Sequence, residues 1–216
     1  MLQRLNRPRW TGRQRRIGLT GGIASGKSSV GARLTAQGLP VLDADAYARQ
    51  ALAPGGAATS AVLARYGERA AGGAPATIDR AALGRIVFAD PLERQWLERL
   101  VHPIVRARFD AELQRLAAEP VVVLMIPLLF EAGLEELCSE VWLVDCDESQ
   151  QLQRLMARDG LSEGDARARI AAQWPLARKR PLADRLIDNR GGPDQLAQEM
   201  EGALRGGAGE VGARAP

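Results

Sequence analysis

Lysine, histidine and cysteine are nearly absent from this sequence, and their scarcity limits the sites that it can form. The 216 residues include two lysines, one histidine and two cysteines. Cys138 and Cys146 lie far from any further cluster of cysteine or histidine, so the pattern does not indicate a zinc site. We expect two reduced, partly buried thiols instead.

Long hydrophobic runs are missing as well. The longest, residues 121–130, contains Pro127 and is shorter than the ~20 apolar residues that a membrane-spanning helix needs. An apolar content of 46% and a charged content of 25% are typical of globular proteins. The chain is long enough for one domain with a sizeable core and small insertions, and we expect a cytoplasmic protein with no membrane partner.

Aromatic residues that could stack on nucleic-acid bases are few. The excess of basic charge lies at one end of the chain. Residues 1–16 hold six arginines and no acid, whereas the rest has 23 basic and 26 acidic residues. The bulk of the chain is therefore mildly acidic, which argues against a nucleic-acid partner. The basic end has no apolar segment of a secretory signal. We expect a disordered extension over residues 1–15, with an organelle transit segment as the alternative.

Lysine occurs only at positions 27 and 179, while the other 27 basic residues are arginines. Lys27 lies inside a glycine-rich stretch. In a chain that uses arginine almost everywhere, this choice indicates that a compact ammonium matters at position 27, because a lysine is a point charge and an arginine is a planar fork.

Five short apolar stretches predict buried strands, and helical patterns fill the gaps between them. This alternation predicts an α/β fold with a parallel sheet. Two helical segments interrupt it, at residues 59–118, where Pro103 predicts a kink or two abutting helices, and at the arginine-rich residues 148–181. The predicted strands are residues 16–20, 40–43, 121–126, 140–146 and 185–187.

The stretch GGIASGKS, residues 21–28, fits the pattern G-x-x-x-x-G-K-[ST] between a predicted strand and a predicted helix. Glycines let backbone N–H groups converge on an anion, and the helix N-terminus adds partial positive charge. Lys27 would reach the β- and γ-phosphates of a nucleoside triphosphate, and the Ser28 hydroxyl could ligate Mg²⁺. The Cβ of Ala24 favours a negative φ in this loop.

Two carboxylates follow the second predicted strand, in VLDAD. Alternation along a strand would put Asp43 and Asp45 on one face at the carboxyl edge of the sheet, where open α/β sheets bind ligands. An aspartate there could orient or deprotonate an attacking hydroxyl. A solvated turn before a helix near Ala46 is the alternative, with Asp45 as a possible N-cap.

The arginine-rich segment could close over the transferring phosphoryl group, and Arg154 and Arg158, four residues apart, would share a helix face. Most of its arginines are equally well explained as a solvated surface. The only histidine, His102, lies in an apolar row, where it is either a packed residue or, beside Pro103, a residue that faces a substrate cleft.

Taken together, LTGGIASGKSSV, VLDADAYARQ, LERLVHPIVR, IPLLFE and LIDNRG resemble, in this order and at compatible spacing, the dephospho-CoA kinase family. The resemblance covers about residues 16–204. It implies a P-loop NTPase-type three-layer fold with a five-stranded parallel sheet, a helical substrate-side insertion (59–118) and a lid (148–181), followed by a flexible tail (205–216). The implied reaction is transfer of phosphate from ATP, with Mg²⁺, to the ribose 3′-hydroxyl of 3′-dephospho-CoA.

The resemblance also implies roles for individual residues. Lys27, Asp45 and Arg154 would be catalytic, with Asp45 as the candidate base, although spacing leaves open whether Asp43 serves instead. Ser28 would bind the metal. The remaining residues are sorted by substrate: Gly22, Ala24, Ser25, Gly26, Lys27, Ser28, Ser29, Asn189 and Gly191 for ATP, and Asp43, Arg49, His102 and Arg158 for the acceptor.

Two other functions fit the same motifs. A nucleoside or nucleotide kinase of this fold would share the loop, the carboxylate and the lid. A nucleotide-dependent switch would share the loop alone, and its GTPase version should show N-K-x-D, which the sequence lacks. ATP and 3′-dephospho-CoA are therefore the expected small-molecule partners, and the oligomeric state stays open.

Overall fold

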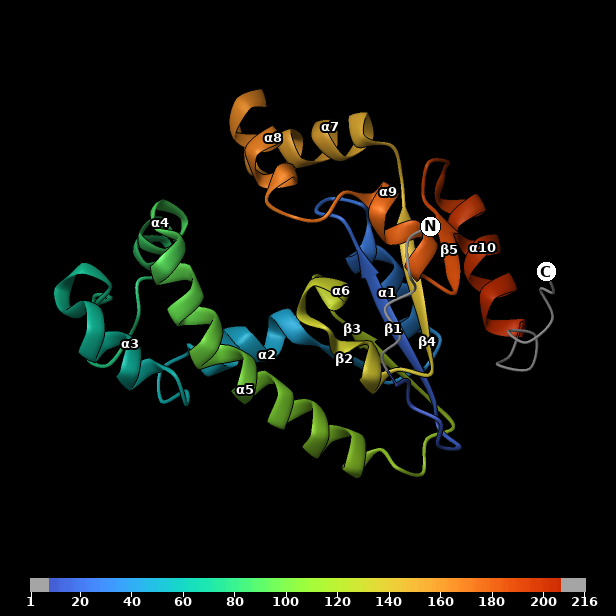
Figure 1. The fold of residues 1–216 in the computed structure, drawn as a ribbon, viewed down its shortest axis with the longest axis horizontal. Helices are drawn as coiled ribbons and strands as arrows, with labels where there is room; N and C mark the ends of the chain where they lie inside the picture. The colour runs from blue at the N-terminus through green and yellow to red at the C-terminus, as the bar shows by residue number, and fades with distance from the viewer. Residues whose placement is uncertain (1–7, 207–216) are drawn as a thin grey trace. The chain divides into compact units, whose positions relative to one another are not determined.

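The structure, a computed structural model, describes residues 8–206, which form two compact units (Figure 1). Residues 8–42 and 117–206 make up the first, here called the sheet unit, and residues 43–116 make up the second, the helical unit. The expected helical insertion at 59–118 thus corresponds to a unit that begins earlier, at Asp43. Within the described residues no helix is both long and apolar enough to cross a membrane.

The sheet has five strands in the order β2-β3-β1-β4-β5, and β1 pairs in parallel with β3 and β4, as β4 does with β5. The predicted α/β class with a five-stranded parallel sheet is confirmed. The strand predictions are correct to within one residue at each end. The strands are β1 (Arg15–Gly21), β2 (Val41–Asp43), β3 (Val121–Met125), β4 (Glu140–Asp145) and β5 (Arg185–Asp188).

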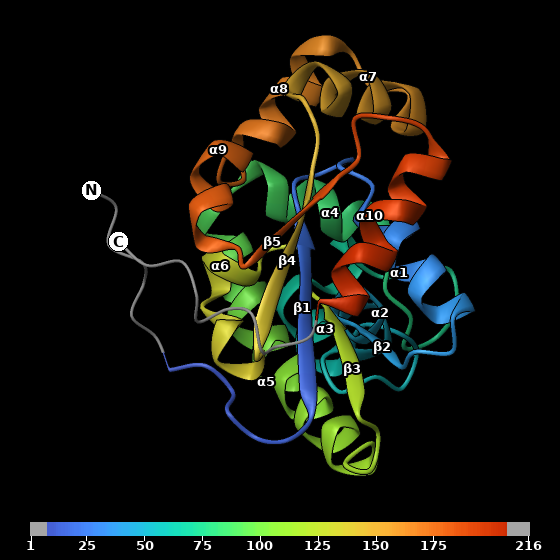
Figure 2. The same cartoon turned by 90° about the vertical axis from the view of Figure 1, so that its right-hand side faces the viewer.

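Helices cover both faces of the sheet, which gives three layers (Figure 2). On one face α1 (Lys27–Ala36) and α10 (Pro193–Arg205) bury Val30, Leu34 and Met200 against the strands. On the other face Leu129 of α6 (Leu129–Ala132) and Leu176 of α9 (Leu176–Lys179) are buried, with η2 (Leu134–Leu137) beside them. Strands buried on both faces explain why they read as continuous apolar runs.

Between β4 and β5 the chain forms α7 (Glu148–Asp159), α8 (Glu163–Ala171), α9 and η3 (Arg180–Leu182). We call residues 148–182 the α7–η3 segment. Asp147 and Gln150 form a capping box at the start of α7. Ser162 is the N-cap of α8, because its hydroxyl accepts a hydrogen bond from the Asp165 N–H in the first turn of the helix.

The helical unit consists of α2 (Ala44–Ala51), α3 (Thr59–Tyr66), η1 (Gly67–Arg69), α4 (Arg80–Ala89) and α5 (Pro91–Arg115). Its apolar cluster joins buried Val62 and Leu83 with Trp96 of α5. At the other end of α5 the rings of Tyr47 and Phe109 meet edge to face, 5.3 Å apart. Of the two outcomes expected at Pro103, a kink or two abutting helices, the second is wrong, because α5 continues through Pro103 as one 25-residue helix. Packing along both ends holds the helix together despite the lost N–H.

Glu93 joins α5 to α3 through an ion pair and a hydrogen bond. Arg65 donates two hydrogen bonds to its carboxylate, at 2.7 and 3.0 Å, and the Tyr66 hydroxyl donates another at 2.6 Å. These donors lower the pKa of Glu93 from 4.5 to about 2. Because the folded-state pKa is the lower one, the stabilisation is complete above pH 4.5 and is lost as the pH falls toward 2.

We therefore expect Glu93→Gln to unfold at a lower temperature than the wild type at pH 7, and the gap to close as the pH falls from 4.5 toward 2. Thermal unfolding followed by circular dichroism across this range measures the gap. Glu98→Gln is the matched control on the same helix, because within residues 8–206 Glu98 has only an exposed pair with Arg94 at 3.8 Å. A gap for Glu93→Gln that does not change with pH would contradict this role.

Residues 8–15 make specific contacts with the rest of the chain, whereas a disordered extension was expected over residues 1–15. Trp10 donates its backbone N–H to the Cys138 carbonyl at 3.1 Å, and the Arg16 guanidinium stacks 3.5 Å from its ring centre. Arg9 pairs with Asp184 at 3.2 Å, and β1 begins at Arg15. A tryptophan and an acidic partner therefore anchor this stretch. Residues 1–7, and residues 207–216 of the expected tail, lie outside the described part of the chain.

Candidate functional site

The glycine-rich loop follows β1, the central strand, at its carboxyl end. After β1 the chain enters α1 on one face of the sheet, and after the neighbouring β3 it enters α6 on the other face (Figure 2). Such a switch point is where open α/β sheets bind ligands. The loop runs directly into α1, whose first residue is Lys27. Lys27 is only 8% exposed, whereas Ser28 and Ser29 are exposed. The predicted strand, loop and helix arrangement is present.

Two glycines of the loop lie very close to neighbouring side chains. A Cβ at Gly22 would overlap the amide nitrogen of Gln151, and a Cβ at Gly26 would overlap that of Asn189. Gly26 also has a φ of 99°, in the left-handed region, and it is the N-cap of α1. Gly26 is therefore needed for its backbone conformation, and at both positions a Cβ would force the neighbouring amide to shift.

Ala24 departs from the negative φ expected for it, because its φ is 57°. An alanine in this region carries a steric cost of about 1–2 kcal/mol, and a β-branched residue is a rarer outlier there. The tight turn between β1 and α1 imposes this conformation in spite of the Cβ.

We expect Ala24→Gly to be tolerated, with stability within about 1 kcal/mol of the wild type, because relief of the backbone cost is offset by a more flexible unfolded chain. Ala24→Val should destabilise by about 1–3 kcal/mol and weaken ATP binding. Denaturant unfolding and calorimetric titration with ATP measure the two effects. A valine variant with unchanged stability and affinity would show that the loop does not need this conformation.

The backbone carbonyl of Ser25 is the point at which several predicted residues meet. The Asn189 amide donates to it at 2.7 Å, and Nη1 of Arg154 lies 3.5 Å away. Arg154 also donates through Nη2 to the Asn189 carbonyl at 2.9 Å. The structure thus brings Arg154 of α7 and Asn189, which follows β5, to the glycine-rich loop. The Ser25 side chain is 1% exposed, and its hydroxyl has no hydrogen-bond partner within the described residues.

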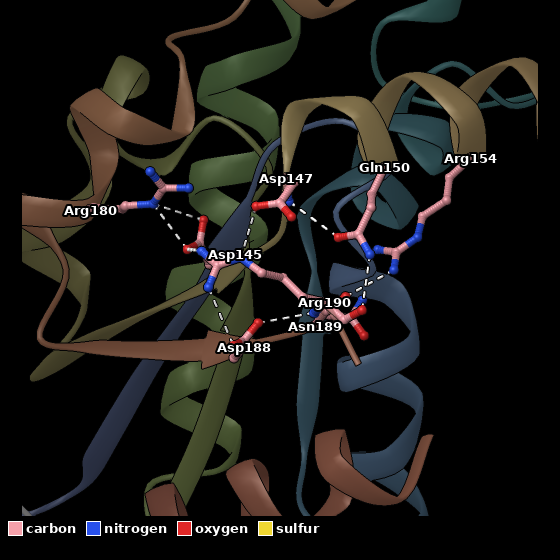
Figure 3. Close-up of polar contacts among 8 residues, drawn as sticks. All are labelled: Asp145, Asp147, Gln150, Arg154, Arg180, Asp188, Asn189 and Arg190. Atoms are coloured by element: carbon pink, nitrogen blue, oxygen red, sulfur yellow. Dashed lines mark hydrogen bonds and ion pairs between the residues drawn. The ribbon is translucent and has the colours of Figure 1, made fainter. Parts of the chain in front are cut away.

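The ends of β4 and β5 are held together by a network around Asp145 (Figure 3). The Asp145 carboxylate is nearly buried and accepts hydrogen bonds from Arg180 Nε at 3.0 and 3.1 Å and from Arg190 Nη2 at 2.7 Å. Arg190 also pairs with Asp147 at 3.0 Å, and its carbonyl accepts from Gln150 at 2.9 Å. This network fixes the loop that carries Asn189 and Gly191.

In the helical unit, Asp43 and Asp45 do not alternate along a strand as expected. β2 ends at Asp43, α2 begins at Ala44, and Asp43 rather than Asp45 is the N-cap, because its Oδ1 accepts from the Asp45 N–H at 2.9 Å. The other Asp43 oxygen lies 3.7 Å from Arg49. Asp45 is exposed, and among the described residues its carboxylate has no hydrogen bond or ion pair.

Three further candidates are exposed. His102 of α5 is exposed, so it is not the packed residue of the first alternative. Arg158 pairs with its neighbour Asp159 at 2.7 Å and does not join the contacts of Arg154, although both belong to α7. Gly191 is exposed two residues beyond Asn189.

Several residues that contact the loop could not be recognised from the sequence alone. Gln151 and Gln173 contact the glycine-rich loop, but a lone glutamine has no recognisable pattern. Lys179 could have been noticed as the second lysine. It is fully buried, and its ammonium lies 2.7 Å from Glu131 of α6. A compact ammonium suits this buried pair better than the bulkier guanidinium of an arginine.

The cysteines are not available for covalent catalysis. Burial raises the pKa of the Cys138 thiol to about 12 and that of Cys146 to about 11, so both are protonated near neutral pH. Both are free and buried, in agreement with the sequence expectation of reduced thiols.

The side chains near the loop could bind Mg²⁺ only together with the phosphates of a bound nucleotide. Within residues 8–206 no three His, Cys, Asp or Glu side chains form a group that could hold a metal ion. The exposed Ser28 hydroxyl at the start of α1 is a hard oxygen ligand of the kind that Mg²⁺ accepts. The residues therefore fit an ion that arrives with a nucleotide and keeps phosphate and water ligands.

The matching family model and the curated relatives name the same family. The family model of dephospho-CoA kinase matches residues 15–195. The dephospho-CoA kinase of Synechococcus sp. (strain CC9605) is 71% identical over 180 residues, which cover 83% of this chain and 87% of the relative. That of Gloeobacter violaceus is 49% identical over 205 residues, covering 94% and 98%.

Two solved structures are similar over most of the chain. A crystal structure from Thermus thermophilus has 39% identity and a TM-score of 0.77, with 90% of this chain and 98% of the other covered. The dephospho-CoA kinase from Campylobacter jejuni has 28% identity and a TM-score of 0.66, with 88% and 95% covered.

Proposed function

This chain belongs to the dephospho-CoA kinase family, and on that premise we propose that it transfers the γ-phosphoryl group of ATP to the ribose 3′-hydroxyl of 3′-dephospho-CoA, giving CoA and ADP. The observation that carries the proposal is the phosphate loop at the carboxyl end of the central strand, with Lys27 at the N-terminus of α1. Phosphoryl transfer depends mainly on positioning and charge neutralisation, and this loop supplies both.

In this proposal the triphosphate lies in the loop formed by residues 22–29. Backbone N–H groups and the positive end of α1 bind the phosphate oxygens, and Lys27 neutralises charge on the transferring group. Because Lys27 is almost buried, its charge acts at low effective dielectric, where it stabilises an anion more than it would in water. When bound with the nucleotide, Mg²⁺ would neutralise phosphate charge, with Ser28 as the protein ligand.

We assign the general base to Asp45. The Asp43 carboxylate already caps α2 and lies near Arg49, whereas that of Asp45 is exposed and has no partner within the described residues. A base must be accessible to the proton that it removes. Asp43, Arg49, His102 and Arg158 remain the proposed acceptor-binding residues.

Arg154 and Asn189 are assigned to the nucleotide. Asn189 and Gly191 would line the adenine, and the rigid Asp145 network supports their loop. Arg154 already contacts the Asn189 carbonyl, so a change of rotamer would bring its guanidinium to the phosphates.

We further propose that residues 148–181 act as a lid that excludes water and that residues 59–118 form the substrate side. Two free buried thiols support a reducing compartment such as the cytoplasm.

The test is ADP release by the purified protein with Mg-ATP, with and without 3′-dephospho-CoA. Adenosine, AMP and pantetheine serve as control acceptors. ADP formation that requires 3′-dephospho-CoA and is matched by CoA in the product would support the proposal. Turnover with adenosine or AMP alone would retain a kinase but reject the substrate.

A further inference from the structure

The peptide groups on both sides of Ile23 in the phosphate loop are held by side chains from the α7–η3 segment. The amide of Gln151 donates to the Ile23 carbonyl at 2.8 Å, and the Ile23 N–H donates to the side-chain oxygen of Gln173 at 3.0 Å. The backbone donor and acceptor of one loop residue are thus satisfied by two glutamines from distant points of the segment.

We propose that Gln151 and Gln173 are positioning residues that couple the α7–η3 segment to the phosphate loop, so that the loop takes its nucleotide-binding form while both hydrogen bonds are made. The proposal rests on the function proposed above, since it concerns the same phosphate site. Neither glutamine is assigned contact with substrate. They act through the Ile23 backbone.

The close fit of the loop to Gln151 supports a specific contact. Gln151 is only 5% exposed, and a Cβ at Gly22 would overlap its amide nitrogen. A polar side chain buried this deeply needs a defined partner, and the Ile23 carbonyl is that partner. The glycine thus leaves the space that Gln151 uses to reach the next residue.

Both glutamines are presented from anchored positions. Gln151 follows the capping box of Asp147 and Gln150 at the start of α7. Beside Gln173, the Trp174 N–H donates to Glu131 of α6 at 3.1 Å, and Glu131 also lies 2.7 Å from the buried Lys179. Displacement of either end of the segment would therefore act directly on the loop backbone.

The two hydrogen bonds run in opposite directions, which permits a sharp experiment. Gln173 accepts, so Gln173→Glu keeps an acceptor for the Ile23 N–H. Gln151 donates, so Gln151→Glu would place a carboxylate oxygen against the Ile23 carbonyl. Both variants add one negative charge beside the same residue and repel ATP to a similar extent. Gln153→Glu adds that charge at an exposed site on the same helix and is the matched control.

We expect Gln151→Glu to raise KM for ATP and the ATP Kd by about tenfold more than Gln173→Glu does, with KM for 3′-dephospho-CoA unchanged and Gln153→Glu close to the wild type. Steady-state kinetics and calorimetric titration with ATP measure these constants. Equal effects of Gln151→Glu and Gln173→Glu would show that only charge matters and would overturn the proposal.

Two uncharged variants keep the proposal testable if Gln151→Glu does not fold. Gln151→Met and Gln173→Met remove each hydrogen bond without adding charge. In Gln173→Met the Ile23 amide proton should exchange with solvent about tenfold faster, as measured by NMR on the nucleotide-free protein. Unchanged exchange would overturn the proposal. This readout needs no turnover, so absence of 3′-dephospho-CoA-dependent ADP formation in the wild type would reject the proposed function separately.

Discussion

Lys27→Ala is expected to lower kcat by about 10³-fold, because it removes the charge that is aimed at the transferring phosphoryl group. The ammonium lies at the first residue of α1 and is 8% exposed, so no other side chain or solvent cation can replace it readily. The loss should be mainly in kcat, since the loop amides and the helix N-terminus still bind phosphate in the variant. ADP release with saturating Mg-ATP and 3′-dephospho-CoA measures it.

Lys27→Arg is the matched control, because it keeps the charge and changes the shape. A planar guanidinium at this nearly buried position should leave most of the loss in place, since the two cations are not interchangeable there. A near-normal kcat for Lys27→Ala would mean that the glycine-rich loop is not where the phosphate is transferred.

Asp45→Asn is expected to lower kcat by about 10²–10⁴-fold, the usual contribution of a general base, while the ATP Kd stays unchanged. Asparagine keeps the size of the side chain and removes its basicity. Because Asp45 is exposed in the first turn of α2 and caps nothing, the substitution should leave the helix intact. Pre-steady-state phosphoryl transfer and calorimetric titration with ATP separate the two quantities.

Asp43→Asn tests the other carboxylate. Asparagine is as good an N-cap as aspartate, so α2 should be preserved, and the loss of charge beside Arg49 should appear mainly in KM for the acceptor. If Asp43→Asn has the larger loss in kcat, the base is Asp43. A weaker ATP affinity in Asp45→Asn would instead indicate a role for Asp45 in metal binding.

The sheet was predictable because its strands are buried on both faces and therefore appear as short apolar runs between helices. The phosphate loop was predictable because an anion cradle needs glycines, a lysine and a helix start in a fixed order. Even here Ala24 was misjudged, since the turn imposes a positive φ that its side chain disfavours.

The contacts that orient the loop were not predictable in the same way. Gln151, Gln173 and Asp145 act through backbone groups or through arginines distant in sequence, and these pairings exist only once the strands are aligned. The cap of α2 shows the same limit at short range. β2 ends at Asp43 as predicted, but α2 begins at Ala44 and not near Ala46, and this earlier start moves the cap from Asp45 to Asp43.

The burial of both lysines makes amine acylation a selective reporter for this protein. Lys179 is fully buried and Lys27 is 8% exposed, while the other 27 basic side chains are arginines, which amine reagents leave unmodified. Apart from the terminal amine, the folded surface therefore offers almost no background. Mass shifts at two peptides then report two separate events: acylation of Lys179 reports opening of the core, and acylation of Lys27 reports opening of the phosphate loop.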